Sequence, residues 1–215
     1  MRRRDRRLFI VKPAITERCI KNYMFPEQII YLTFLFYIPG YYFYLRDIVH
    51  GQNRPNLVSW FFWMLGPFLG AFFQFKAGAG LVALPTFMAG FGPFVVVLFF
   101  IWHKNAYWKL TIFDIFCGIL SLVALIFYIF THNLEGSIVF AILSDIFAAI
   151  PTIVKSWKMP ENESAQPYMI GIVTNLLGLL IIKNWIFSIY SFGIYLVIVN
   201  LSLVFCIYRK KILRN

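Results

Sequence analysis

Apolar residues in this chain come in long blocks that are separated by short polar joints. Seven such blocks, of about 17–22 residues, are long enough to cross the hydrocarbon core of a bilayer as helices. We predict them at residues 29–45, 57–75, 81–102, 110–131, 137–154, 168–183 and 186–207. A membrane β-barrel would instead show alternating segments of about ten residues. The pattern therefore predicts an all-α, polytopic membrane protein.

The composition supports this class. Hydrophobic residues make up 60% of the 215 residues and charged residues only 13%, whereas soluble chains are roughly half apolar and a quarter charged. The net charge of +11 lies in the tails and joints, so we expect anionic lipid headgroups, and not nucleic acid, as partners. No joint is long enough to form a soluble domain. The expected location is a cell membrane, multi-pass, specifically a bacterial inner membrane.

The positive charges give two answers for the orientation in the membrane. Lys and Arg divide ten to ten between the two sides. Without the N-terminal tail the division is two to ten, which favours a C-terminus inside.

Two stretches of the chain match each other without a gap when one is shifted by 112 positions, 37–66 onto 149–178. The matched residues include Ile38-Pro39 with Ile150-Pro151, Pro55 with Pro167, and Gly66 with Gly178. Because matching blocks are four blocks apart, both copies have the same direction in the membrane. We predict a 3+1+3 arrangement of two parallel repeats, related by an axis along the membrane normal.

This arrangement divides the chain into five segments. They are a basic N-terminal arm (1–28), a first three-helix repeat (29–102), a linker helix with flanking loops (103–136), a second three-helix repeat (137–207) and a basic C-terminal tail (208–215).

The "IPG" at 38–40 and the "IPT" at 150–152 are each followed by a short polar loop and a second proline. In this respect the chain resembles the SWEET and PQ-loop superfamily, although the glutamine of the proline–glutamine pair is absent from both copies. It looks more similar to a bacterial branch of that superfamily. The resemblance implies seven spans, an N-terminus outside, and alternating-access transport of a small solute.

Four prolines at matched positions, Pro39, Pro55, Pro151 and Pro167, are candidates for hinges. A proline inside a helix removes a hydrogen bond and bends the chain. One interpretation is that the four let the two halves rock against each other. The alternative is that Pro39 and Pro151 are plain kinks and the others ordinary helix-start prolines.

Asp145 lies in the middle of the block 137–154. A carboxylate at that depth costs several kcal/mol unless it is buried, paired or protonated. No Lys or Arg lies at matching depth, so we expect Asp145 to be neutral, hydrated, or bound to hydroxyl and amide groups such as Thr174, Asn175 or Asn200. A buried carboxyl that gains and loses a proton is what a proton-coupled transporter needs. We therefore predict that Asp145 is a proton-coupling site; a structural hydrogen bond is the alternative.

Trp63 and Asn175 occupy equivalent positions in the two copies, eight residues after Pro55 and Pro167. We expect them to face each other across a central cavity. Similarity to SWEET proteins, which line sugar sites with Trp and Asn, implies a substrate-binding role for Trp63, Asn175 and Asn200, and we add Thr174. The other tryptophans are predicted to lie in an interfacial belt, and Asp114 to be an interfacial charge.

The function predicted from these features is alternating-access transport of a small polar solute, sugar-like or another metabolite, with proton coupling as a further expectation. The alternative is a membrane interaction or scaffold protein without flux. An enzyme is not expected, because the sequence shows no nucleophile–base set or phosphate loop. We expect no metal site and no cofactor, and further copies of the chain remain open as partners.

Overall fold

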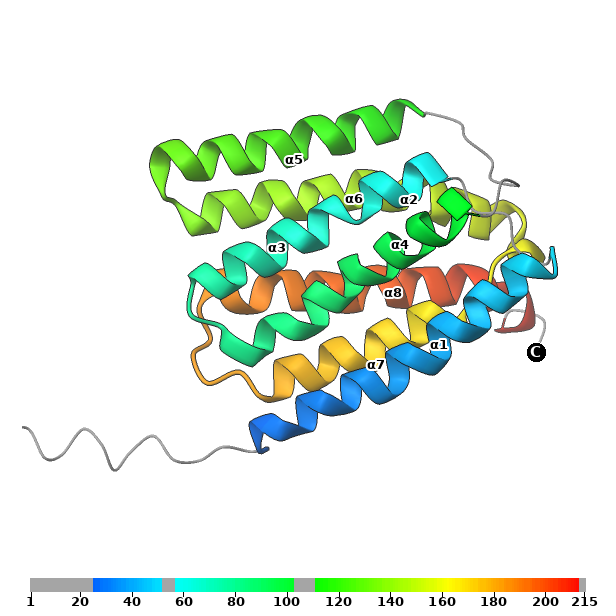
Figure 1. The fold of residues 1–215 in the computed structure, drawn as a ribbon, viewed down its shortest axis with the longest axis horizontal. Helices are drawn as coiled ribbons and strands as arrows, with labels where there is room; N and C mark the ends of the chain where they lie inside the picture. The colour runs from blue at the N-terminus through cyan, green and yellow to red at the C-terminus, as the bar shows by residue number, and fades with distance from the viewer. Residues whose placement is uncertain (1–24, 52–56, 103–110, 213–215) are drawn as a thin grey trace, which may run out of the picture.

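The computed structural model describes residues 25–51, 57–102 and 111–212, and every regular element in these ranges is a helix (Figure 1). Successive helices run in alternating directions along the long axis of the molecule. The elements are η1 (Glu27–Tyr31), α1 (Leu32–Val49), α2 (Leu57–Trp63), α3 (Leu65–Lys76), η2 (Gly80–Ala83), α4 (Leu84–Trp102), α5 (Ile112–Thr131), α6 (Leu134–Lys158), η3 (Pro160–Asn162), α7 (Gln166–Leu180) and α8 (Phe187–Ile212). The predicted all-α class is confirmed for the described residues.

Four stretches of helix in the described part are long and apolar enough to cross a membrane. They are Gly80–Ile101, Ile112–Thr131, Leu134–Lys158 and Phe187–Arg209. The helix α7 is apolar but shorter, and α1 has 18 residues with four tyrosines between 37 and 44. Each predicted block coincides with a helix to within a few residues, and α2 and α3 together occupy the second block.

The break between α2 and α3 falls at Met64. Pro67 follows three residues later and has no backbone N–H, so the carbonyl of Trp63 loses its partner in the helical ladder. This proline was not among the predicted hinge residues.

The outward faces of the helices carry large apolar side chains, while small and polar side chains face inward. In α5 the buried residues follow a spacing of three or four positions. They are Asp114, Cys117, Ser121 and Ala124. The opposite face exposes Ile119, Leu122, Ile126 and Phe130, among others. Soluble proteins rarely expose apolar faces of this kind, whereas such faces are compatible with a lipid environment.

The helices other than α5 pack in two groups of three. In the first group α4 contacts α1 and also the broken helix α2–α3, whereas α1 and the broken helix share no comparable contact. In the second group α8 contacts both α6 and α7, and these two are likewise not packed on each other. The third helix in sequence thus lies between the other two in both groups.

Contacts between the two groups also come in matching pairs, in which the first helix of one group packs on the second helix of the other. The helix α1 packs on α7, and the broken helix α2–α3 packs on α6. Weaker contacts join α3 to α8 and α4 to α7. The remaining helix, α5, lies at one edge beside α6 and also touches α2 and α3 (Figure 1).

The interface of α5 with α6 contains polar contacts. The Ser144 hydroxyl donates to the Cys117 carbonyl at 3.0 Å and lies 2.6 Å from the Ser121 hydroxyl.

Asp114 forms a capping box with Thr111: Oδ2 accepts from the backbone N–H and the hydroxyl of Thr111 at 2.8 and 2.7 Å. Asp114, predicted to be an interfacial charge, lies in the first turn of α5, and its side chain is buried within the protein as part of the helix cap.

Removing this cap should weaken the protein. In Thr111→Val the backbone N–H of Asp114 loses its acceptor and Oδ2 loses one of its two donors. We expect a loss of about 1 kcal/mol of stability, measured as a lower midpoint of thermal unfolding in detergent. Ser202→Ala is the control, because Ser202 is exposed and bonds only within its own helix. Equal midpoints for the two variants would contradict the role given to the cap.

Candidate functional site

A cavity of about 50 Å³ lies between the two groups of helices, with room for a few water molecules. Every described α-helix except α5 contributes to its wall. The lining residues are Tyr37, Tyr41, Trp60, Trp63, Pro67, Ala89, Pro93, Asp145, Pro167, Tyr168, Gly171, Leu196, Val199 and Asn200. We call this space the central cavity. Its wall combines aromatic rings with a carboxyl group and a carboxamide, a combination typical of sites for small polar molecules.

Asp145 enters this cavity from the middle of α6. The small residues Ala141 and Ala148, one turn to either side, are also buried, because this face of α6 packs closely against α3 and α8. The closest approach is at Gly66: a methyl group on it would lie 2.7 Å from Cβ of Asp145. The carboxyl group is therefore held at the junction of three helices, two of which belong to the second group.

The carboxyl group of Asp145 has one firm partner. The hydroxyl of Tyr195 in α8 donates to Oδ2 at 2.7 Å. The indole of Trp63 lies against the same carboxyl, while Oδ1 makes no hydrogen bond of normal geometry. A buried carboxyl oxygen without a partner is costly in a protein interior. It is also the group that a water, a proton or a polar solute in the cavity would satisfy.

Asp145 does accept a hydrogen bond from a hydroxyl group, but the donor is not one of the residues named in the prediction. No described hydrogen bond joins Asp145 to Thr174, Asn175 or Asn200; the partner is Tyr195. The physical reason is the packing order, since α8 lies between α6 and α7 and keeps the two residues of α7 away from α6. Tyr195 carries a hydroxyl group, but its place in the sequence does not say which helix it meets.

Two of the four predicted substrate-binding residues line the cavity, Trp63 and Asn200. Asn175 and Thr174 do not. Both are buried in α7 and bond to their own helix: Asn175 Nδ2 donates to the Gly171 carbonyl at 2.8 Å, and the Thr174 hydroxyl to the Ile170 carbonyl at 2.9 Å.

Asn175 therefore does not face Trp63 across the cavity as expected. The ring that lies near Trp63 is Tyr168, with centroids 6.3 Å apart. Because Tyr168 is larger and lies in the first turn of α7, it takes the position that repeat equivalence assigned to Asn175.

Most of the aromatic residues in the cavity wall were not predicted from the sequence. Tyr37 and Tyr41 are stacked with ring centroids 5.6 Å apart. Trp60, which was predicted to lie in an interfacial belt, is buried. Its ring centroid lies 5.7 Å from that of Trp63. The spacing of Tyr37 and Tyr41 by four positions was a usable signal, because it places both rings on one helix face. For Trp60 the closeness to a predicted helix end pointed the other way.

Of the candidate hinge prolines that the structure describes, one lines the cavity and two do not. Pro167 lines the cavity from the first turn of α7. Pro39 and Pro151 lie inside α1 and α6 but are not part of the cavity wall, and Pro39 is exposed on the outer face. Pro55 lies outside the described residues. Two unpredicted prolines, Pro67 and Pro93, do line the cavity.

One end of the cavity is held by an ion pair within the second group. Tyr168, whose ring forms part of the wall, donates its hydroxyl to Oε1 of Glu163 at 2.9 Å. Lys155 Nζ donates to Oε2 of the same carboxylate at 2.8 Å, and the Glu163 side chain is only 4% exposed. The position of Tyr168 is therefore fixed by an ion pair between α6 and the joint that precedes α7, in which the carboxylate is buried.

Among the described residues no group of three or more His, Cys, Asp or Glu is arranged to hold a metal ion. Comparisons with protein-family models, with curated proteins and with solved structures found no match to this chain.

Proposed function

We propose that this protein is an integral membrane transporter that binds a small polar solute in the central cavity and moves it by alternating access. The observation that carries the proposal is the cavity itself, which lies between two similarly built groups of helices and contains a buried carboxyl oxygen without a partner. Sites between structural repeats near the middle of the membrane are where secondary transporters bind their cargo. The membrane in question is a bacterial inner membrane, crossed several times.

The contact pattern supports seven spans in a 3+1+3 arrangement. If α1, α2–α3 and α4 are exchanged for α6, α7 and α8, the contact of α1 with α7 becomes that of α6 with α2–α3, and both are present. The contact of α4 with α7 likewise becomes that of α8 with α3. Two parallel repeats related by a two-fold axis would produce such pairs, and α5 would be the linker. The resemblance to SWEET and PQ-loop proteins agrees with this arrangement.

The chemistry of the wall favours a solute with both a flat or ring-shaped face and polar groups. The indole of Trp63 and the stacked tyrosines offer aromatic faces, and Asn200 offers a carboxamide. Asn200 is tied to its own helix through Nδ2, which donates to the Leu196 carbonyl at 2.7 Å. A solute of sugar size is larger than about 50 Å³, so the helices must separate for binding, as alternating access requires.

Solute binding can be tested by thermal stabilisation of the purified protein. A solute that binds the cavity should raise the unfolding midpoint by roughly 5–10 °C when it is present at about a hundred times its Kd. Trp63→Ala should remove this rise, because the largest ring of the wall is lost. Trp185→Ala is the matched control, since Trp185 is 58% exposed and lies outside the cavity. A rise that is unchanged in Trp63→Ala would contradict the assignment of the site.

A further inference from the structure

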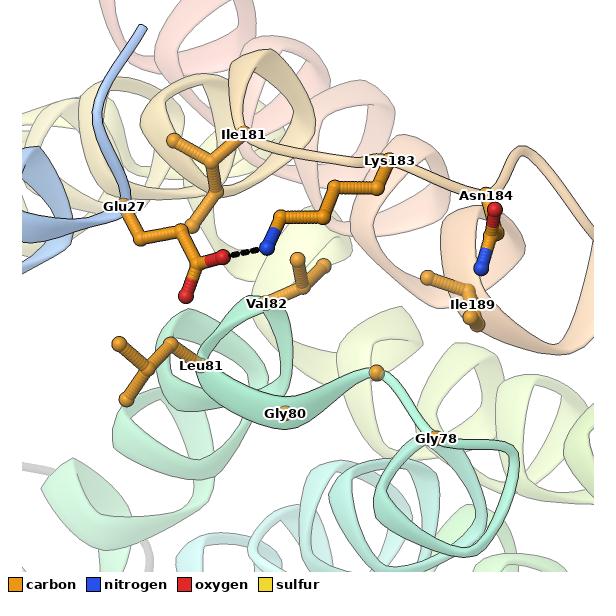
Figure 2. A pocket seen from close by; sticks show the side chains of 10 residues that line it. Glu27, Gly78, Gly80, Leu81, Val82, Ile181, Lys183, Asn184 and Ile189 are labelled. Carbon is orange, nitrogen blue, oxygen red and sulfur yellow. Dashed lines mark ion pairs between the residues drawn. The ribbon is translucent and has the colours of Figure 1, made fainter. Parts of the chain in front are cut away.

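A second pocket, of 180 Å³, lies at the end of the molecule where α3 is joined to η2 and α7 to α8. We call it the vestibule. Figure 2 shows Glu27 and Lys183 reaching toward each other across it, with Val82 beside them, and their charged groups form an ion pair. Glu27 belongs to the first group of helices through η1 and Lys183 to the second, so the pair links the two groups at this end.

Four buried polar side chains lie in the helix turns next to this end. They come from four helices, two in each group, and we call them the polar layer: Thr33 of α1, Gln74 of α3, Asn175 of α7 and Ser191 of α8. Each has a side-chain oxygen without a hydrogen-bond partner, and they account for four of the seven such atoms in the described residues. In a membrane interior an unsatisfied polar group is expensive, so a cluster of four from both groups needs a reason.

Two residues of the polar layer are hydrogen-bonded to the walls of the two spaces, one to each. Gln74 Nε2 donates to the carbonyl of Ile189, a residue of the vestibule wall, at 2.7 Å. Asn175 Nδ2 donates to the carbonyl of Gly171, a residue of the cavity wall.

The two groups are in close contact one helical turn from Gln74 and from Asn175. A methyl group on Gly178 of α7 would lie 2.9 Å from Pro85, at the start of α4. One on Gly70 of α3 would lie 2.4 Å from the ring of Phe192 in α8. The two groups are therefore tightly packed against each other beside the polar layer.

We propose that the polar layer is the closed half of the solute path and that the Glu27–Lys183 ion pair holds it closed. The inference rests on the proposed transport function and adds its second entrance. When the groups separate at this end, water reaches Thr33, Gln74, Asn175 and Ser191, and their unpartnered oxygens gain hydrogen bonds. In the closed state these four oxygens have no hydrogen-bond donor, although the amide nitrogens of Gln74 and Asn175 are bonded to backbone carbonyls.

The accessibility of a single cysteine tests this path. Ser191→Cys is made in a protein that carries Cys19→Ser, Cys117→Ala and Cys206→Ala, held in lipid nanodiscs, and the rate of its modification by a charged methanethiosulfonate reagent is measured. We expect slow modification with the ion pair intact. The rate should rise about fivefold in Lys183→Gln, the factor expected for loss of a half-exposed ion pair, and return to the low value when Glu27→Lys and Lys183→Glu are combined.

Ser144→Cys is the matched control. Ser144 is also buried, in the α5–α6 interface, where its hydroxyl is hydrogen-bonded, and it lies off the proposed path. If Ser191→Cys reacts no faster than Ser144→Cys in all three backgrounds, the path is wrong. If it reacts at one rate whatever the state of the ion pair, the role of that pair is wrong. Cysteine modification needs no solute, so it can be measured even if no transported solute is found. If transport is found but Ser191→Cys is not modified, the proposed path is wrong and the transport function is not.

Discussion

Proton-driven accumulation of solute should be lost in Asp145→Asn while the fold is kept. Asparagine has nearly the same size, and its carboxamide oxygen can still accept the hydrogen bond from Tyr195 that Oδ2 accepts now. It cannot gain or lose a proton. If one proton moves with each solute, a gradient of one pH unit sustains up to about a tenfold accumulation, since one unit is worth about 1.4 kcal/mol. In the variant the ratio of inside to outside concentration should fall to about one.

The measurement is uptake into proteoliposomes with and without an imposed pH gradient. Glu135→Gln provides a control on the same helix, because Glu135 is an exposed acid in the first turn of α6 and lies outside the cavity. Exchange of solute without a gradient should persist in Asp145→Asn, which separates lost coupling from lost binding. Accumulation by Asp145→Asn equal to that of the wild-type protein would leave the carboxyl group with a structural role only.

Gly66→Ala should destabilise the protein by about 1–3 kcal/mol, although alanine is the better helix former. The added methyl group would lie 2.7 Å from Cβ of Asp145 and 3.1 Å from the carbonyl oxygen of Ala141. These atoms belong to, or are attached directly to, the backbone of α6, so relief requires the two helices to move apart. The shift would also move Trp63 away from the carboxyl group and weaken solute binding.

Gly193→Ala makes the same chemical change in α8 with a different neighbour. Its methyl group would lie 3.2 Å from the tip of the Leu179 side chain, which can rotate away. We expect this variant to stay within about 0.5 kcal/mol of the wild-type protein. Thermal unfolding of both variants in one detergent compares them; a Gly66→Ala protein as stable as Gly193→Ala would contradict the close approach of α3 and α6.

The helices could be predicted from the sequence because the apolar blocks are long and their polar joints short. The small inward stripe of α6 was also predictable: Ser137, Ala141 and Asp145 are all buried. Ile138, the neighbour of Ser137 in the chain, is fully buried as well. The inward face of α6 is wider than one stripe, because α3, α5 and α8 all pack on it.

The composition of the site was harder to predict, because it depends on which helices are neighbours. Repeat equivalence paired Trp63 with Asn175, but only Trp63 lies on the cavity. The hydrogen bond between Tyr195 and Asp145 joins residues 50 positions apart in the chain. No local pattern links them, and the packing of α8 on α6 that creates the contact is a property of the whole bundle.

Uptake of radiolabelled solutes into proteoliposomes tests the central claim, that the cavity between the two groups is a transport site. A panel of sugars, amino acids and vitamins is supplied to wild-type protein, to Trp63→Ala and to Trp185→Ala. The account predicts saturable uptake of at least one solute by the wild-type protein and by Trp185→Ala, and its loss in Trp63→Ala. Absence of uptake across the whole panel by a folded wild-type protein would contradict it and favour a membrane scaffold without flux.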